Sequence, residues 1–532
     1  MAMSGLRRLT SLVLAMVLLA GLAACGVDQK KTLRIVAGSE QRAVLEQIVT
    51  PWCKDKGYTC EYDLLGSVDQ ARLLQDGSTQ YDAYWFASSV FAQLGNTEGN
   101  LRHVQPMFLT PVVFAARPEV LDRMNLNRDD VTIADVVTAV ESGSAKVWAT
   151  NPTQSNSGAT ALFAFMNHFA GNGPGQPLTQ EQLDSPQVDE GVRTFIRAID
   201  RTPPSTGTMM EECVAAPQEC EAMFTYEALV IEQNQQLVQQ GQQPFRVVYP
   251  HGGIAISDAP LGFRATGAAD AEKEKVFTEL QDFLLRDAGA RSKLLGLGRR
   301  PADSIGLTLT NPDQNVFNPA WGIKTDIREQ GVTYPAAPVI EETLARYHTR
   351  YRRPTNIYYC LDGSGSMSGD GWDGVKRAAH EIFDAERARV NLLQTAPQDQ
   401  TSVSIFNSTP QPAKTVTGND PAQLKQLEQL VIDYRPGGGT DMYACLKEAT
   451  SSLQARHTAD NKSLIVLMSD GQSSGDEQGA LQTLRSTGIP VVSIAFGSAD
   501  PGQLRPVGEA SGGAYVESGN LVQALRTAAG YK

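Results

Sequence analysis

The spacing of apolar residues predicts alternating strands and helices along most of the chain. An apolar run at 33–36 is followed by a Gly-Ser-Glu turn and by helical spacing over 41–49, and the alternation continues to about residue 300. After residue 355 the pattern predicts strands at 356–361, 401–406, 463–469 and 489–496, and helices at 373–393, 421–432 and 442–453. The run 463–469 is apolar between its two serines, which is typical of a parallel strand buried on both faces. The pattern therefore indicates an α/β fold.

An interruption divides this pattern into an N-terminal unit at 32–300 and a C-terminal unit at 355–532. The stretch from Pro301 to Pro335 contains Asn311-Pro312 and Asn318-Pro319 and has no clear periodicity. Helical spacing returns over 338–352. We therefore expect residues 301–354 to form a linker and a connecting helix between the two units.

The first residues have the features of a secretory signal. Arg7 and Arg8 precede an apolar run at 12–19, and Leu22-Ala23-Ala24-Cys25 follows it. This tetrad resembles a bacterial lipobox, whose cysteine thiol receives a diacylglyceryl group and becomes the first residue of the mature chain. The resemblance implies a signal peptide at 1–24, a lipid on Cys25 and a tether at 25–31, whereas an ordinary signal peptide or a short anchor helix is the alternative. Acyl chains bury many methylene groups, so the lipidated protein would stay on the cell membrane, facing the extracytoplasmic side.

The composition limits the partners. The chain has 46 basic and 59 acidic side chains, which gives a formal charge of −13. An acidic chain repels phosphate backbones at long range, and no run of Lys or Arg reverses the charge locally. We therefore expect no nucleic-acid partner. Beyond the N-terminal signal, no stretch is apolar enough to span a bilayer.

Six cysteines besides Cys25 predict disulfides, because an even number in an oxidising compartment is typical of them: Cys53, Cys60, Cys213, Cys220, Cys360 and Cys445. Several connectivities are open. Cys53 with Cys60, and Cys213 with Cys220, would each close a short loop, so we expect these two pairs. Cys360 with Cys445 then follows by elimination. A zinc site is the alternative, but the chain has no C-x-x-C motif and its histidines are widely spaced.

Oxygen-bearing side chains follow three predicted strand ends in the C-terminal unit. Asp362, Ser364 and Ser366 come directly after the strand at 356–361, Thr440 lies in a Gly-rich turn before a helix, and Asp470 follows the strand at 463–469. Ligands bind at the carboxyl ends of strands in open parallel sheets. Carboxylates and hydroxyls together suit a small hard cation such as Mg²⁺. A set of serine and glycine turns that only cap helices is the alternative.

These five residues resemble the metal-ion-dependent adhesion site (MIDAS) of a von Willebrand factor type A (VWA) domain, and the resemblance covers about residues 355 to 532. It implies a Rossmann-like domain with a mainly parallel central sheet and helices on both faces. It also implies that Mg²⁺ or Mn²⁺ is bound by Ser364, Ser366 and Thr440, with Asp362 and Asp470 acting largely through water. A carboxylate of a protein partner would complete the metal shell.

Two enzymatic interpretations of the same turns fail. A phosphotransferase of the haloacid dehalogenase type needs a second acid where this chain has Ser364. The G-x-S-x-G match at 471–475 would need a histidine further along the chain, and the last histidine is His457.

In the N-terminal unit, hydroxyl groups stand at several strand-to-helix turns. Ser39, Ser88 and Ser157 occupy such turns, and Tyr226 follows an apolar run at 222–224. Free backbone N–H groups at these turns would suit an anion or a polar solute, although helix capping is an equally good role for the serines. Glu40 departs from an oxyanion site, because its carboxylate would repel an anion.

The N-terminal unit as a whole resembles a type 2 bacterial extracellular solute-binding protein, similar to those for oxyanions such as molybdate and sulfate. The runs 109–116 and 245–250 look like strands that cross between two lobes, so residues 112–245 would form a second lobe inserted into the first. In that family such turns hold the ligand in the cleft, which makes Ser39, Ser88, Ser157 and Tyr226 the candidates here for a small polar or anionic solute.

The sequence therefore predicts a membrane-anchored lipoprotein that joins solute binding to metal-dependent protein binding, and not an enzyme. Two alternatives stay open: an enzyme of unknown type in the N-terminal cleft, and a structural scaffold of the cell envelope. A binding protein would close on its ligand without converting it, whereas a scaffold would depend on neither metal nor solute.

Overall fold

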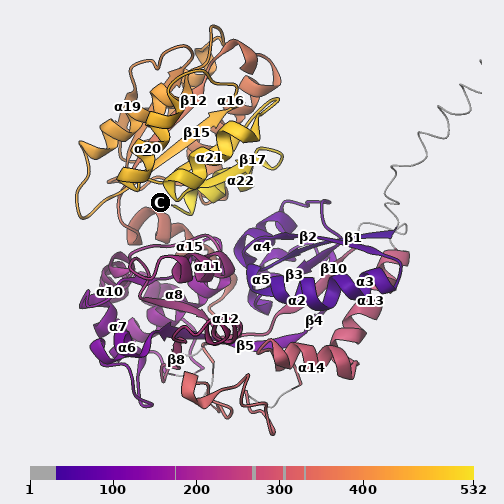
Figure 1. The fold of residues 1–532 in the computed structure, drawn as a ribbon. Helices are drawn as coiled ribbons and strands as arrows, with labels where there is room; N and C mark the ends of the chain where they lie inside the picture. The colour runs from indigo at the N-terminus through magenta and orange to yellow at the C-terminus, as the bar shows by residue number, and fades with distance from the viewer. Residues whose placement is uncertain are drawn as a thin grey trace, which may run out of the picture.

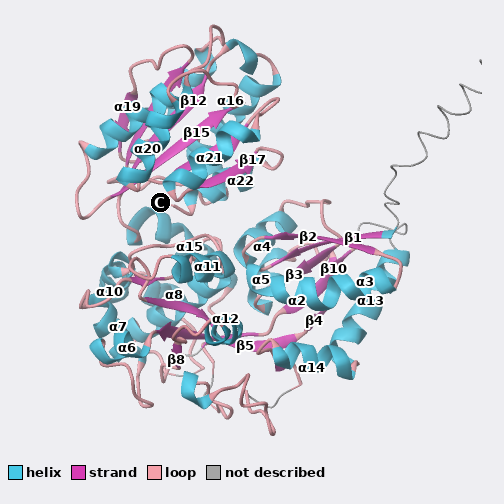
Figure 2. Cartoon of the chain, in the orientation of Figure 1, coloured by secondary structure: helices cyan, strands magenta, loops and turns pink. Residues whose placement is uncertain are grey.

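The computed structural model describes residues 31–173, 175–253, 255–265, 271–303, 307–328 and 331–531. The predicted signal peptide and the predicted lipid site at Cys25 lie outside these residues. Figure 1 shows an upper unit formed by the C-terminal part of the chain and, below it, two lobes formed by the N-terminal part. Each of these three bodies is built around its own sheet (Figure 2).

The first lobe has a five-stranded sheet in the order β2-β1-β3-β10-β4, in which β10 runs antiparallel to β3 and β4. Its strands are β1 (Thr32–Ala37), β2 (Thr59–Leu64), β3 (Ala83–Trp85), β4 (Leu101–Pro106) and β10 (Pro260–Arg264). Its helices are the continuous segment η2 (Ser39–Gln41), α2 (Arg42–Val44), η3 (Leu45–Val49) and α3 (Thr50–Asp55), then α4 (Ser67–Gln75), α5 (Ser89–Gly95), α13 (Ala271–Arg286) and α14 (Ala288–Gly296).

The second lobe is built on the long strand β5, which pairs antiparallel with β7, β8, β9 and β11. Its strands are β5 (Phe108–Ala116), β6 (Val147–Trp148), β7 (Ala222–Tyr226), β8 (Arg246–Val248), β9 (Ala255–Ser257) and β11 (Arg300–Pro301). Its helices are α6 (Pro118–Arg123), α7 (Ile133–Glu141), α8 (Asn156–Phe169), α9 (Gln180–Leu183), α10 (Pro186–Ala198), α11 (Thr206–Ala215) and α12 (Glu227–Gln239).

The segment between the two predicted units packs on both lobes. Leu307, Phe317 and Trp321, the last in η5 (Pro319–Trp321), join the apolar core of the second lobe. Further on, α15 (Ala337–Arg346) and η6 (Tyr347–Tyr351) contribute Ile340 and Tyr347 to a core that also contains residues of α4, α5 and α8. These residues therefore tie the lobes together as well as connecting them to the C-terminal unit.

The C-terminal unit has a six-stranded sheet in the order β14-β13-β12-β15-β16-β17, parallel except for β14. Its strands are β12 (Thr355–Asp362), β13 (Gln400–Phe406), β14 (Lys414–Thr417), β15 (Lys462–Ser469), β16 (Val491–Ala495) and β17 (Ala514–Glu517). Its helices are η7 (Gly365–Met367), α16 (Asp370–Phe383), α17 (Ala385–Val390), α18 (Pro421–Asp433), α19 (Met442–Gln454), α20 (Glu477–Thr487), α21 (Pro501–Ser511) and α22 (Leu521–Ala529).

Helices cover both faces of this sheet. Apolar residues of α16, α18 and α22 pack on one face, and those of α19, α20 and α21 pack on the other. The four strands predicted here form at or within two residues of the expected positions. The single helix expected at 373–393 is instead α16 and α17, because Asp384 leaves the helical conformation and its carboxylate accepts from the Arg387 N–H at 3.0 Å.

The structure forms the three predicted disulfides: Cys53–Cys60, Cys213–Cys220 and Cys360–Cys445. The first two close local loops of sequence separation 7, whereas the third joins residues 85 positions apart. In the described part of the chain, no helix is both long and apolar enough to cross a membrane.

Candidate functional site

The carboxyl edge of the C-terminal sheet brings the five predicted metal residues to three connected turns. Asp362 ends β12, Asp470 follows β15, and Thr440 stands two residues before α19. The turns are held to one another by backbone hydrogen bonds: the Gly437 N–H donates to Gly363 O at 2.9 Å, the Gly365 N–H to Gly438 O at 3.1 Å, and the Ser474 N–H to Thr440 O at 2.9 Å. The order of the strands in the sheet therefore gathers residues that are far apart in the sequence.

The side chains of the first turn are organised around Asp362. The Ser364 N–H donates to Asp362 Oδ1 at 3.0 Å, and the hydroxyls of Ser364 and Ser366 lie 3.1 Å apart. Ser469, which the sequence analysis missed, donates from its hydroxyl to Asp362 Oδ2 at 2.6 Å. Its place directly before Asp470 at a strand end was the signal that could have identified it.

The electrostatics of this edge fit a divalent cation. Burial raises the pKa of Asp362 above its ordinary value, and the negative charge of Asp470 raises it further. Asp362 and Asp470 are both buried, so water screens their repulsion poorly. A bound cation would relieve that repulsion, and the serine and threonine hydroxyls are neutral ligands that leave part of its charge for an outside anion. Among the described residues, no cluster of three or more His, Cys, Asp or Glu side chains is placed to hold a metal.

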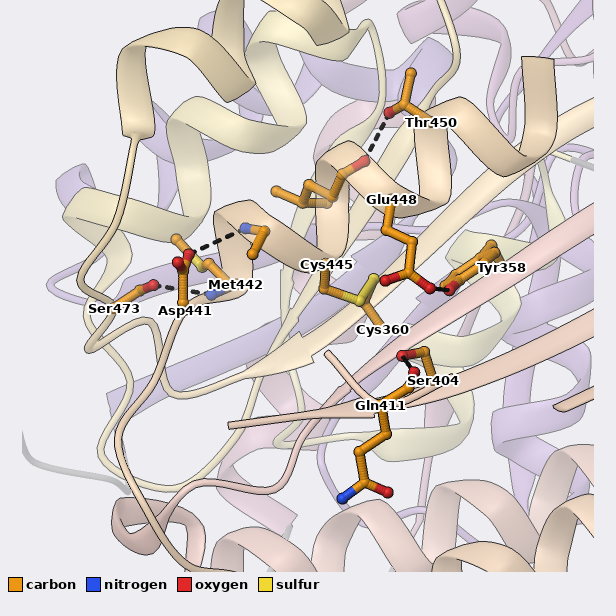
Figure 3. Close-up of a disulfide and its surroundings, with 12 residues drawn as sticks. Tyr358, Cys360, Ser404, Gln411, Asp441, Met442, Cys445, Glu448, Thr450 and Ser473 are labelled. Carbon is orange, nitrogen blue, oxygen red and sulfur yellow. Dashed lines mark hydrogen bonds between the residues drawn. A yellow bond between two sulfur atoms is a disulfide. The ribbon is translucent and has the colours of Figure 1, made fainter. Parts of the chain in front are cut away.

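The disulfide Cys360–Cys445 lies near this edge, and Figure 3 shows it beside Tyr358 and Glu448. Cys360 is two residues before Asp362 in β12, and Cys445 is in the first turns of α19, shortly after Thr440. Next to it the Tyr358 hydroxyl donates to Glu448 at 3.0 Å. The cross-link therefore connects the strand that carries Asp362 to the helix that follows Thr440.

Ser473, the centre of the G-x-S-x-G match, has a structural role. Its hydroxyl accepts from the Met442 N–H at 2.9 Å at the start of α19, as Figure 3 shows. The Asp441 carboxylate accepts from the Ala444 N–H at 3.0 Å in the same turn. Both side chains satisfy N–H groups at the helix start.

The four predicted solute residues lie at the junction of the two lobes. Ser39 and Ser88 belong to the first lobe and Ser157 and Tyr226 to the second, and each is at most 4% exposed. Ser39 accepts from the Gly207 N–H of the second lobe at 2.8 Å. The lobes are therefore closed over this surface.

Asn156, Thr206 and Ser257, which the sequence analysis did not single out, complete the cluster. The Asn156 amide donates to the Tyr226 hydroxyl at 2.9 Å and to the Ser257 hydroxyl at 3.0 Å, and the hydroxyls of Ser157 and Thr206 lie 2.7 Å apart. The hydroxyls of Ser88 in the first lobe and Ser257 in the second lie 3.5 Å apart. Asn156 directly precedes the predicted residue Ser157 in the sequence, but no motif distinguished Thr206 or Ser257.

Two families match the chain. Residues 33–292 match the bacterial extracellular solute-binding protein family, and residues 356–526 match the von Willebrand factor type A domain. The chain joins a solute-binding domain to a VWA domain. Both predicted resemblances, and the α/β fold with a Rossmann-like VWA domain, are confirmed. Solute-binding proteins of this kind act outside the cytoplasm, which indicates an extracytoplasmic location.

Solved structures similar to the chain include two solute-binding proteins. The sulfate-binding protein SubI from Mycobacterium tuberculosis H37Rv is 17% identical, with 51% of this chain and 88% of that chain covered and a TM-score of 0.38. AfuA from Actinobacillus pleuropneumoniae, with fructose-6-phosphate bound, is 12% identical, with 60% and 99% covered and a TM-score of 0.43. An aerotolerance-related membrane protein from Bacteroides fragilis NCTC 9343 is 16% identical, with 33% and 98% covered and a TM-score of 0.27. No curated protein matches the sequence.

Proposed function

We propose that the protein is a lipid-anchored binding protein of the cell envelope, in which the VWA domain captures a protein partner through a divalent metal and the two-lobed domain binds a small solute. The observation that carries the metal-dependent part is the connection of the Asp362, Thr440 and Asp470 turns at one edge of the sheet. Ser364, Ser366 and Thr440 would hold Mg²⁺ or Mn²⁺, with Asp362 and Asp470 behind them.

The metal would supply a positive charge at an exposed surface. Because the groups facing outward are neutral hydroxyls and the two carboxylates stand behind them, part of the positive charge would remain at the open side of the site, where a partner carboxylate would add. Ser366 is exposed whereas Asp362 and Ser364 are buried, so the hydroxyl of Ser366 lies on the side from which a partner approaches. The Ser469 hydroxyl and the Ser364 N–H each donate to the Asp362 carboxylate and so hold its orientation.

A lipid on Cys25 would place this surface outside the cytoplasm and close to the membrane. The tether at 25–31 leads directly into β1, so the solute-binding domain would be the part nearer the bilayer along the chain.

Calorimetric titration of Mg²⁺ into the mature chain tests the metal site. We expect Asp362→Ala to lower the Mg²⁺ affinity at least about tenfold, because the carboxylate that organises the first turn is lost. Asp373→Ala is the matched control, since Asp373 is an exposed carboxylate on the nearby helix α16 and is paired with Lys376. Equal Mg²⁺ affinity in wild type and Asp362→Ala, with the fold intact by circular dichroism, would contradict the proposal.

A further inference from the structure

A pocket of about 800 Å³ lies between the second lobe and the VWA domain, apart from the metal edge and from the junction of the lobes. Its lining includes Trp148, Asp200 and Arg201 of the second lobe, and Lys462 and Pro490 of the VWA domain. Ligand pockets have volumes of this order and occur preferentially between domains. We call it the interdomain pocket, and its charged groups indicate the chemistry of a ligand.

Arg201 holds the two walls of the interdomain pocket together. Its Nη2 donates to Gly512 O of the VWA domain at 3.1 Å and lies 3.1 Å from the Glu212 carboxylate. Its guanidinium group also lies over the ring of Trp148, 4.8 Å from the ring centroid. These contacts already occupy Arg201, so it positions the walls and is not the cation that awaits a ligand.

Most carboxylates of this surface are paired within the chain. A smaller hollow beside the pocket shares Lys146 and Asp200 with it. The acidic residues that line the pocket and the hollow are Asp200, Glu219, Glu221 and the exposed Glu141. Glu219 pairs with Lys146 at 2.8 Å, and Glu221 pairs with Arg123 at 2.5 Å. Asp200 is therefore the buried-side carboxylate that remains to balance further cations.

Lys462 in the pocket and Arg353 in the hollow are the lining Lys and Arg side chains that form no ion pair with a described residue. The Lys462 N–H donates to Pro354 O at 2.9 Å, which puts Lys462 beside Arg353, and Arg353 Nε donates to Arg197 O at 2.7 Å. Burial raises the pKa of Asp200, so its negative charge forms less readily. At least one positive charge is therefore in excess here when Lys462 is protonated.

The surroundings of Lys462 disfavour its ammonium form. Burial, followed by the positive charges of Arg353, Arg352 and Arg201, lowers the pKa of Lys462 to about 7, whereas the negative charge of Asp200 acts in the opposite direction. Near pH 7 the side chain is thus close to half protonated. A negative charge placed beside Lys462 would offset the repulsion and favour the ammonium form.

We propose that the interdomain pocket binds a small organic acid as its carboxylate, held between Lys462 and Arg353. The carboxylate supplies the negative charge that this surface lacks, and each cation would donate a charge-assisted hydrogen bond to it. The Ser463 hydroxyl, which lines the pocket and has no partner among the described residues, offers a further donor. Pro203 and Ile489 line the same pocket and offer apolar surface to the body of the ligand. This site is independent of the proposed metal and solute sites.

Calorimetric titration of the full mature chain with benzoate and with benzamide tests this site, because the two compounds have the same ring and differ in charge. At pH 6 we expect benzoate to bind at least about tenfold more tightly than benzamide. From pH 6 to pH 9 at matched ionic strength, the benzoate affinity should fall about tenfold or more, because Lys462 loses its proton. Equal affinities for the two compounds, a benzoate affinity independent of pH, or no benzoate binding would each overturn the proposal.

A variant locates the binding in the interdomain pocket. Lys462→Met removes the charge and keeps an unbranched side chain, and it should lower the benzoate affinity at pH 6 about tenfold or more. Lys414→Met is the matched control, since Lys414 is exposed on β14 of the same domain. Equal benzoate affinity in wild type and Lys462→Met would overturn the role of Lys462. The wild-type comparison of pH 6 with pH 9 decides the matter even where the variant does not fold.

Discussion

At the scale of single residues, Glu40 is a carboxyl group that the fold buries where η2 contacts α11 of the second lobe. Burial raises the pKa of Glu40 to about 7, while the backbone N–H and the charge of Arg299 act in the opposite direction. The ionised form is therefore less stable in the folded chain than in the unfolded one.

The raised pKa of Glu40 predicts a loss of folding stability that depends on pH. Because the folded pKa of Glu40 lies above its unfolded value, Glu40 costs no stability below the unfolded pKa of 4.5, and the cost grows as pH rises and is complete above about pH 7. We expect Glu40→Gln to stabilise the folded chain more at pH 8 than at pH 4.5. The change that it makes in the free energy of unfolding should differ by about 3 kcal/mol between the two pH values. Urea unfolding at the two pH values measures this, with Glu46→Gln as the control. If Glu40→Gln changed the free energy of unfolding equally at both pH values, the prediction would be contradicted.

At the scale of elements, the Cys360–Cys445 disulfide couples two turns at the carboxyl edge of the C-terminal sheet. It joins β12 to α19 with Cα atoms 6.1 Å apart, and both cysteines are fully buried. Asp362 ends the strand, and Thr440 lies just before the helix. The position of one turn relative to the other therefore depends on this cross-link as well as on the packing of α19.

Removal of this disulfide should affect metal binding as well as stability. For a closed loop of this length, Cys360→Ala with Cys445→Ala is expected to cost about 4 kcal/mol, and removal of the local Cys53–Cys60 pair about 2 kcal/mol. Only removal of Cys360–Cys445 should also weaken Mg²⁺ binding, because Cys53–Cys60 lies in the first lobe. Urea unfolding and calorimetry on both variants check this, and equal Mg²⁺ affinity in the two would contradict the coupling.

At the scale of the whole molecule, the C-terminal helix α22 of the VWA domain contacts both lobes. Figure 1 shows α22 at the lower edge of the upper unit, facing the lobes. Arg526 is 2% exposed; it forms an ion pair with Asp69 of the first lobe and donates to Thr153 O of the second lobe. Leu392 of the VWA domain also joins the core of α4 and α8. The closed arrangement of the lobes and the docking of the VWA domain are thus stabilised by shared contacts.

Loss of these contacts should loosen the lobes. Arg526→Ala leaves Asp69 buried without its cation, and we expect a cost of about 3 kcal/mol. Amide hydrogen exchange at Val68 and Gly207, which donate across the lobes to Gln154 O and Ser39 Oγ, should quicken about tenfold or more. Arg505→Ala is the control, because Arg505 is exposed on α21 over the ring of Tyr515. Unchanged exchange at both amides would show that α22 does not hold the lobes closed.

Away from the proposed metal and solute sites, the VWA domain and the second lobe border the partly open interdomain pocket. This cavity of about 800 Å³ lies between the second lobe and the VWA domain, lined by residues that include Trp148, Lys462 and Pro490. Burial lowers the pKa of Lys462 to about 7. The lining of this cavity contains none of the predicted metal or solute residues.

The sequence by itself determined the features that depend on local spacing. Apolar runs located the VWA strands, the separation of 7 identified two disulfides, and the turns after β12 and β15 carry residues of the predicted metal site. Only the tertiary structure decided the contacts of Ser469 with Asp362, of Asp258 with Ser89, and of Arg526 with Asp69, which join residues 107, 169 and 457 positions apart. Local preferences act within a few residues, whereas the partner of a buried charge depends on which elements the fold brings together.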